Sequence, residues 1–268
     1  MQIPSNRRSA VALGLLCAAV SLAQPSLREV KENGVSLRYS PEYFSEHTVK
    51  QEPRLTMEEV GTDIPIGVAP AHPVISLKDK RPLPALDRGP RYFSPSYSSI
   101  AIIPLKDPSV KNYVKSYPDV ASEAASLRRA LAQKLRFLAP KPTPPDLNNE
   151  DIEQAFHGRI RYLDFPLFST ISYLTAYTQE DEGDPVNNEE LAFVVQGLTK
   201  DGRYYIDARF AITHPSLPKG IDSTKPMKGL ARKQHLLKVS KDLDAVADES
   251  FWPPVGSFKD LLASLAIR

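Results

Sequence analysis

The clearest pattern of apolar and polar positions lies in residues 187–218 and predicts a β-hairpin. In its second half, apolar and polar side chains alternate with period two from Tyr204 to Ile212, as in a strand with one buried face. Asp201-Gly202 separates this half from the first, and Asp-Gly is a strong signal for a two-residue type I′ turn. The first half is apolar on both faces. We therefore expect it inside a sheet, with helices or loops partly covering its outer face.

The number of residues in the turn decides the register of this hairpin. A two-residue turn, or a four-residue loop closed further out, pairs Phe193 with Phe210 on the core face. A three-residue loop would instead place Phe193 opposite Arg209 and turn the core side chains to the wrong face. We therefore expect an even-numbered loop. Gly197 falls opposite Ile206, which indicates a bulge or a close approach by another element.

The same register gathers polar side chains on the outer face of the hairpin. Tyr205, Asp207 and Arg209 share this face, and Gln196 lies directly across from Asp207. Tyrosine and arginine are common at binding hot spots, so this face is a candidate site for a ligand or a partner. The alternative is cross-strand and diagonal pairing on a solvated face.

Other periodic segments predict further strands and helices around the hairpin. Strands are expected at residues 35–39, 73–78 and 98–105, near 158–165, and at 169–177. Helices are expected from Pro118-Asp119 through Leu138, as a short turn at 150–156, along the stripe Leu236, Val239, Leu243 and Val246, and after a cap at Ser257, with Phe258, Leu261, Leu262 and Leu265 on one face. This order favours an α+β fold, a mainly antiparallel β-sheet with helices packed against it.

Proline-rich stretches interrupt these elements. Residues 53–95 read as a long irregular region that contains one strand. Residues 139–146 are stiff and extended, and could form a domain boundary or a crossover. We prefer the crossover, so residues 24–268 are predicted to form a single α+β domain.

The N-terminus has the pattern of a secretory signal peptide. Arg7 and Arg8 precede an apolar run that is too short to span a bilayer, and small residues follow it. We predict a signal peptide at residues 1–23, with cleavage after Ala23 and no membrane span in the mature chain. Three alternatives stay open: a lipid anchor on Cys17, which Leu16 before it disfavours; a twin-arginine signal; and an uncleaved anchor.

Cleavage at that position changes the composition. The signal carries two of the 34 Lys and Arg residues and none of the 32 Asp and Glu residues, so the mature chain has 34 − 2 − 32, a formal charge of zero. A nucleic-acid partner is therefore not indicated. Cys17 is the single cysteine, so the mature chain has no disulfide, thiolate metal site or cysteine nucleophile. We expect the protein in the periplasm or outside the cell.

No catalytic, cofactor or metal motif is present, and we assign no residue such a role. An acidic loop at residues 179–190 is either solvated or a weak calcium site, with oxygens from Glu180, Asp181, Glu182, Asp184, Asn187 and Asn188. Trp252 reads as a core anchor, with carbohydrate stacking as the alternative. Five histidines are scattered without metal-ligand spacing: His47, His72, His157, His214 and His235.

Several segments carry a resemblance to known proteins. YLDF, ISYLTAYTQ, the 187–218 hairpin and the terminal FKDLLASLAI together resemble a group of uncharacterised bacterial exported proteins and lipoproteins. More loosely, a Gly-x-x-Tyr-Tyr strand after a hairpin turn and a short amphipathic C-terminal helix resemble the PsbP-like fold. That resemblance implies an antiparallel sheet flanked by helices, an αβα sandwich. Neither group implies a catalytic residue.

The sequence thus leads to an exported, non-catalytic module that binds a protein or an envelope component. Two alternatives remain: a hydrolase with a carboxylate or histidine site assembled in space, and a small-molecule binder with a pocket between sheet and helices. An enzyme should show a pocket with convergent titratable residues of perturbed pKa. A partner-binding module should show an exposed apolar or aromatic patch.

Overall fold

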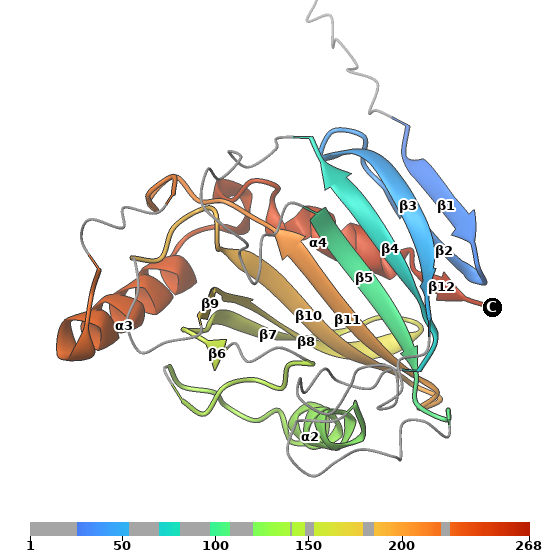
Figure 1. Ribbon diagram of the computed structural model, residues 1–268, viewed down its shortest axis with the longest axis horizontal. Coiled ribbons are helices and arrows are strands. Elements are labelled where there is room, and N and C mark those ends of the chain that lie inside the picture. Colours follow the sequence, from blue (N-terminus) through green and yellow to red (C-terminus); the bar gives the residue numbers. More distant parts are fainter. Residues whose placement is uncertain are drawn as a thin grey trace, which may run out of the picture.

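The computed structural model describes residues 26–53, 70–80, 97–107, 120–139, 141–147, 153–178, 185–220 and 226–268. Its centre is a seven-stranded antiparallel sheet (Figure 1). In spatial order, the strands are β3 (Phe44–Glu52), β4 (His72–Asp79), β5 (Tyr97–Pro104), β11 (Tyr204–Ala211), β10 (Ala192–Thr199), β8 (Phe168–Thr175) and β7 (Gly158–Asp164).

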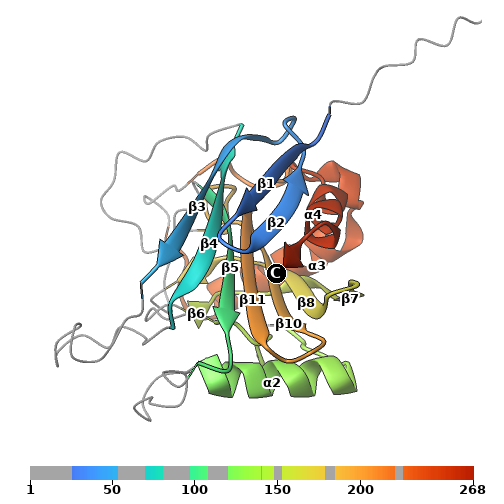
Figure 2. The ribbon, with the colours of Figure 1, turned by 90° about the vertical axis from the view of Figure 1, so that its right-hand side faces the viewer.

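Smaller elements surround this sheet. One small antiparallel sheet contains β1 (Arg28–Glu32), β2 (Val35–Tyr39) and β12 (Ala266–Ile267), and Figure 2 shows it beside α4. Another pairs β6 (Glu153–Gln154) with β9 (Tyr177–Thr178). The helices are α2 (Val120–Gln133), α3 (Gly229–Ala245), α4 (Val255–Ala263) and the 3-10 turn η2 (Asp248–Ser250). The predicted α+β class, mainly antiparallel with helices packed against the sheet, is confirmed. Within the described residues, no helix is long and apolar enough to cross a membrane.

The predicted hairpin register is confirmed. Phe193 pairs with Phe210, and Gln196 pairs with Asp207. The loop between the strands, residues 200–203, has an even number of residues, as expected. Strand β10 lies between β8 and β11 and is buried along its whole length, which explains its apolar residues on both faces.

The turn itself differs from the predicted type. A type I′ turn needs positive φ at both central residues, but of Asp201 and Gly202 only Gly202 has it, at 66°. The Asp201 carboxylate instead accepts hydrogen bonds from the Thr199 hydroxyl, at 2.7 Å, and from the Arg203 amide, at 3.0 Å. The amide of Gly202 donates to the Thr199 carbonyl at 2.8 Å. These side-chain bonds close a four-residue loop without positive φ at Asp201.

Two hydrophobic cores lie on opposite faces of the large sheet. On one face, the rings of Phe193 and Phe210 lie 5.3 and 4.5 Å from the ring of Phe258 in α4. The predicted apolar face of α4 is buried there, while α2 covers the opposite face through Val120, Ala124 and Leu127.

Gly197 lies where neighbouring strands approach closely, one of its two predicted roles. A Cβ at this position would lie 2.9 Å from the Thr170 methyl carbon and 3.2 Å from the Phe168 ring. The pairing of β10 with both neighbours runs through Gly197 without a shift in register. The glycine therefore makes room for β8 rather than forming a bulge.

Several predicted boundaries were wrong. Helix α2 ends at Gln133 because Lys134 has φ of 50°, and Leu138 beyond it is 72% exposed rather than part of the apolar stripe. The described part of the predicted turn at 150–156 contains β6 instead. Helix α4 begins at Val255, two residues before the expected cap. Strands β1 and β3 were not predicted; β3 is an edge strand, whose side chains are mostly polar.

The proline-rich regions are described only in part. Within 53–95, residues 70–80 contain β4, as the sequence predicted, and most of the remainder lies outside the described residues. Residues 1–25, with the predicted signal peptide and Cys17, also lie outside them, as does the predicted helix start at Pro118-Asp119.

Candidate functional site

The polar face of the hairpin is buried, contrary to the expectation of a solvated face. Tyr205 and Gln196 are fully buried, and Arg209 nearly so. Helix α2 packs on the apolar part of this face, and residues 141–147 contribute Asp146 and Leu147 to the polar part. The predicted site residues do come together, but the chain itself covers them.

Asp146 is the centre of this polar cluster. One carboxylate oxygen accepts hydrogen bonds from Arg209 at 3.0 Å and from the Gln196 amide at 3.2 Å. The other accepts from the Tyr177 hydroxyl at 2.6 Å and from the Gln154 amide at 3.3 Å. Four donors from the sheet region therefore hold one carboxylate of the proline-rich segment.

Arg209 carries the compensating charge. Its guanidinium also donates to Asp207 at 3.2 Å and to the Leu147 carbonyl at 2.7 Å. Burial opposes its charged form, but Asp207, Tyr177 and Asp146 outweigh burial and hold the pKa of Arg209 well above its usual value. Burial raises the pKa of Asp146, and the positive charge of Arg209 opposes that rise. The cluster fastens residues 141–147 to the sheet and presents no open surface to a partner.

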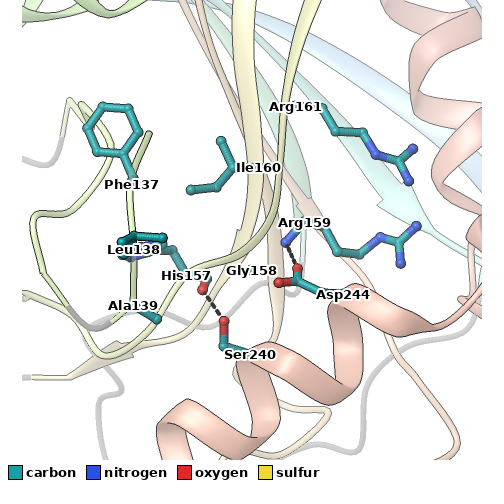
Figure 3. Close-up of a pocket in the computed structure, with 10 residues that line it drawn as sticks. All are labelled: Phe137, Leu138, Ala139, His157, Gly158, Arg159, Ile160, Arg161, Ser240 and Asp244. Atoms are coloured by element: carbon teal, nitrogen blue, oxygen red, sulfur yellow. Dashed lines mark hydrogen bonds between the residues drawn. The ribbon is translucent and has the colours of Figure 1, made fainter. Parts of the chain in front are cut away.

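An open pocket of about 370 Å³ lies elsewhere, beside the edge strand β7 (Figure 3). Residues 137–139 form one side, the start of β7 forms the other, and α3 contributes two side chains. The lining residues are Phe137, Leu138, Ala139, His157, Gly158, Arg159, Ile160, Arg161, Ser240 and Asp244.

A bulge in β7 shapes the wall of this pocket. The register with β8 shifts between Gly158 and Arg161, and Arg159 has φ of 52°. The backbone amide of Arg159 donates to Asp244 of α3. Its guanidinium donates to the carbonyl of Leu243, at 2.8 Å, and also pairs with Asp248. Figure 3 shows this guanidinium and that of Arg161 directed away from Phe137 and Leu138.

Asp248 pairs with both of these arginines outside the pocket. Its carboxylate accepts from Arg161 at 2.6 Å and from Lys259 at 3.1 Å, in addition to its pair with Arg159. Burial favours the protonated form, but the hydrogen bonds and the charges outweigh it and lower the pKa of Asp248 to about 2. The two guanidinium groups are therefore held in an ion-pair network beside the pocket.

His157 is the distinctive polar group of the pocket. The residue is 2% exposed and both ring nitrogens are buried; the Phe137 backbone lies outside strict hydrogen-bond geometry but still interacts with the ring. Burial lowers the pKa of His157, although the nearby Phe137 carbonyl and Asp244 charge partly oppose this. Burial therefore favours the neutral form of this imidazole.

Ser240, His157 and Asp244 are the residue types of a serine hydrolase triad, but their hydrogen bonds are different. A triad needs serine bonded to one imidazole nitrogen and the carboxylate bonded to the other. Here the Ser240 hydroxyl donates to the backbone carbonyl of His157 at 2.6 Å, and Asp244 accepts the Arg159 amide. These bonds fasten α3 to the start of β7.

The other histidines are dispersed and have local partners. The ring nitrogens of His47 and His72 lie 3.0 Å from the Tyr39 hydroxyl and 2.7 Å from the Pro70 carbonyl. A ring nitrogen of His214 lies 2.7 Å from the Ser216 hydroxyl, and His235 accepts the amide of Val186 at 3.1 Å. Across the described ranges, no three His, Cys, Asp or Glu side chains gather in a way that could hold a metal ion.

The acidic loop is described only at its C-terminal end. Residues 179–184, which include four of the proposed calcium-binding carboxylates, lie outside the described part of the chain. Asn187 and Asn188 are buried, and their side chains bond within the protein, for example from Asn188 to the His214 carbonyl at 3.1 Å. Trp252 packs edge-on against Tyr43 with ring centroids 5.1 Å apart, as an anchor of the C-terminal segment would.

Asp79 provides a test of the pH dependence of stability. Burial raises its pKa from 3.8 to about 7, although the Ser98 hydroxyl donates to it at 3.0 Å. The folded protein therefore binds a proton at higher pH than the unfolded chain, and stability from this group is full below pH 3.8 and is lost as pH rises through about 7. At pH 8, we expect the free energy of unfolding of Asp79→Asn to be about 1–3 kcal/mol higher than that of the parent.

Chemical denaturation between pH 4 and pH 8 measures this effect. The parent should lose stability over that interval, and Asp79→Asn should lose less. Equal slopes for the two proteins would show that Asp79 titrates normally.

Sequence reasoning singled out the hairpin face and missed the pocket. The pocket joins three segments, and the bond between Ser240 and His157 spans 83 positions. The Gly158-Arg159 bulge carries no local signal strong enough to find it. No protein-family model matches the chain, and no curated protein matches it either. The resemblance to exported proteins therefore stays a prediction.

Proposed function

We propose that this protein is an exported module without catalytic activity, which recognises a protein or an envelope component through the pocket beside β7. The observation that carries the proposal is an open pocket of about 370 Å³ that combines an exposed apolar side chain, Leu138, with the polar side chains of Ser240 and Asp244. Binding sites commonly combine an apolar surface with a few polar groups that orient the ligand.

The hydrogen bonds around the pocket favour binding over hydrolysis. The Ser240 hydroxyl donates to the His157 carbonyl, and the Asp244 carboxylate accepts from the Arg159 amide. His157 therefore has neither a nucleophile nor an orienting carboxylate bonded to its ring. The volume of about 370 Å³ also suits the small-molecule alternative, since ligand pockets typically measure about 300–1,000 Å³. The signal-peptide pattern of residues 1–23 supports export.

Site-specific photocrosslinking in the native cells tests this proposal. With benzoylphenylalanine in place of Leu138, which is 72% exposed, we expect one discrete adduct after irradiation. The same group in place of Leu27, which is 56% exposed and lies next to β1, is the matched control and should give none. The adduct should form on an exported chain that mass spectrometry shows to begin at Gln24.

Two results would contradict the proposal. An absence of adducts at position 138, or equal amounts of adduct at positions 138 and 27, would show that the pocket is not the recognition site. A chain that retains Met1 and stays inside the cell would contradict the proposal that the protein is exported.

A further inference from the structure

Three of the four large apolar side chains that are exposed in the described part of the chain lie on one surface. Leu230 and Leu237 of α3 are 71% and 38% exposed, and Leu138 is 72% exposed. Leu230, Leu237 and Asp244 follow one another at intervals of two helical turns, so they share one face of α3. Asp244 and Leu138 line the same pocket, so this face of α3 extends to the segment that carries Leu138.

Exposed cations accompany these leucines. Lys233 and Lys241 lie one turn before and one turn after Leu237 on α3, and both are exposed. Arg136 is exposed in the segment that carries Leu138. Among the described residues, Arg136, Lys233 and Lys241 have no ion-pair partner. We call the following residues the basic leucine surface: Arg136, Leu138, Leu230, Lys233, Leu237 and Lys241.

Few carboxylates of the described residues offset these cations. Helix α3 contains two acidic residues, Asp242 and Asp244. Asp242 pairs with Lys238, and Asp244 accepts the backbone amide of Arg159. The basic leucine surface therefore has three cations with Asp244 at its end, and it carries a net positive charge. An anionic partner complements this charge.

The opposite face of α3 fixes the helix to the body of the protein. Val239 and Leu243 on that face are buried in the hydrophobic core, and the Ser240 hydroxyl donates to the His157 carbonyl at 2.6 Å. Figure 1 shows α3 at the left-hand end of the molecule. The core contacts of α3 therefore leave Leu230 and Leu237 facing outward, where a partner can reach them.

The residue types of this surface favour a lipid bilayer over a protein. The cores of protein interfaces are depleted in lysine, and leucine is under-represented among their hot spots. Helices that lie on membranes combine lysines with leucines that enter the boundary between headgroups and acyl chains. A lysine can pack its methylene groups along that boundary while its ammonium group stays among the lipid phosphates.

We propose that the basic leucine surface docks the protein onto a bilayer that contains anionic phospholipid. Leu138, Leu230 and Leu237 enter the boundary between headgroups and acyl chains, and the three cations contact lipid phosphates. The inference rests on the proposed function and names the envelope component. Docking in this orientation also turns the pocket beside β7 toward the lipid headgroups, because Leu138 belongs to both the pocket and the surface.

Sedimentation with vesicles tests the docking. The protein is the exported chain isolated from the native cells, which the signal-peptide prediction expects to lack the apolar run of residues 10–20. Vesicles of equal parts phosphatidylglycerol and phosphatidylcholine should bind it about tenfold or more tightly than vesicles of phosphatidylcholine alone. Binding should weaken as salt rises from about 0.1 M to about 1 M, because the screening length falls from about 10 Å to about 3 Å.

Charge variants assign the cations. Lys233→Gln combined with Lys241→Gln should weaken binding to the anionic vesicles about tenfold or more. Lys50→Gln combined with Lys106→Gln is the matched control. It changes the net charge equally at two exposed lysines, one in β3 at the opposite edge of the sheet from β7 and one after β5, and it should leave binding unchanged.

Leucine variants assign the apolar contacts. Leu230→Ser combined with Leu237→Ser should weaken binding to the anionic vesicles about tenfold, because the leucines no longer enter the bilayer. Leu27→Ser, at a side chain that is 56% exposed next to β1, is the control and should leave binding unchanged. All these side chains are exposed, so the circular dichroism spectra of the variants should match that of the parent.

Each contrary result overturns the inference. Equal binding to the two kinds of vesicle would show that anionic lipid is not recognised, and equal losses in the α3 variants and their controls would show that another surface docks. A protein adduct at position 138 from a chain that does not bind vesicles would assign this surface to a protein partner, which overturns lipid docking and supports the proposed function. Vesicle binding without any adduct at position 138 would support docking and contradict recognition through the pocket, so the two proposals can fail separately.

Discussion

Replacing Arg209 with methionine is expected to lower the free energy of unfolding by about 3–5 kcal/mol. The substitution removes the cation between Asp146 and Asp207, whose side chains are 6% and 14% exposed. Both carboxylates would then remain buried without a compensating charge, which is far more costly than the loss of a surface ion pair. The Leu147 carbonyl would also lose its hydrogen bond from Arg209, and residues 141–147 should loosen from the sheet.

Arg203→Met is the matched control for this prediction. Arg203 also pairs with an aspartate, Asp201, in the same hairpin, but its side chain is 55% exposed. Its loss should cost far less than the loss of Arg209, because water screens an exposed ion pair. Chemical denaturation of the two variants gives the comparison, and hydrogen exchange at residues 143–147 reports the loosening of the segment. Equal losses in the two variants would show that the Asp146 cluster does not hold the segment.

Replacing Phe210 with alanine is expected to cost about 3–5 kcal/mol. Phe210 is fully buried, pairs with Phe193 across the hairpin and stacks on Phe258 of α4. Truncation removes buried apolar surface and leaves a cavity between sheet and helix, which the surrounding side chains fill only in part. Helix α4 should lose its ring contact with Phe210 and keep the one with Phe193.

Thermal and denaturant unfolding of Phe210→Ala measure this loss. Leu237→Ala on α3 removes an apolar side chain that is 38% exposed, and it should cost no more than about 0.5 kcal/mol. A double substitution with Phe258→Ala should reveal a coupling of about 0.5–1.5 kcal/mol between the two rings. A loss well under 1 kcal/mol for Phe210→Ala would contradict the register.

Local patterns were enough to predict the hairpin and its register. The side-chain period of a strand is two, so an even-numbered loop aligns Phe193 with Phe210 whatever the exact turn type. Alternation also predicted β2, and short strand-like segments predicted β4 and β5. Local patterns were insufficient for β3, because an edge strand is mostly polar, and for the end of α2, because the apolar spacing continues past the left-handed turn at Lys134.

The outer face of the hairpin shows where such reasoning stops. Its polar residues read equally well as a solvated face, a ligand site or a buried ion-pair network. The choice depended on Asp146, which reaches Arg209 from 63 positions earlier in the chain. Polarity in a sequence indicates that a group needs hydrogen bonds, but it does not indicate whether water or another side chain supplies them.

The amino-acid pattern thus decided the fold class, the strand that lies inside the sheet and the side of the hairpin that faces the core, because these depend on neighbours within a few residues. Tertiary structure alone decided that the Asp146 cluster is closed and that His157 lines an open pocket. Both sites join segments more than 60 positions apart, 63 for Asp146 with Arg209 and 83 for His157 with Ser240. Their geometry arises only when the sheet has brought those segments together.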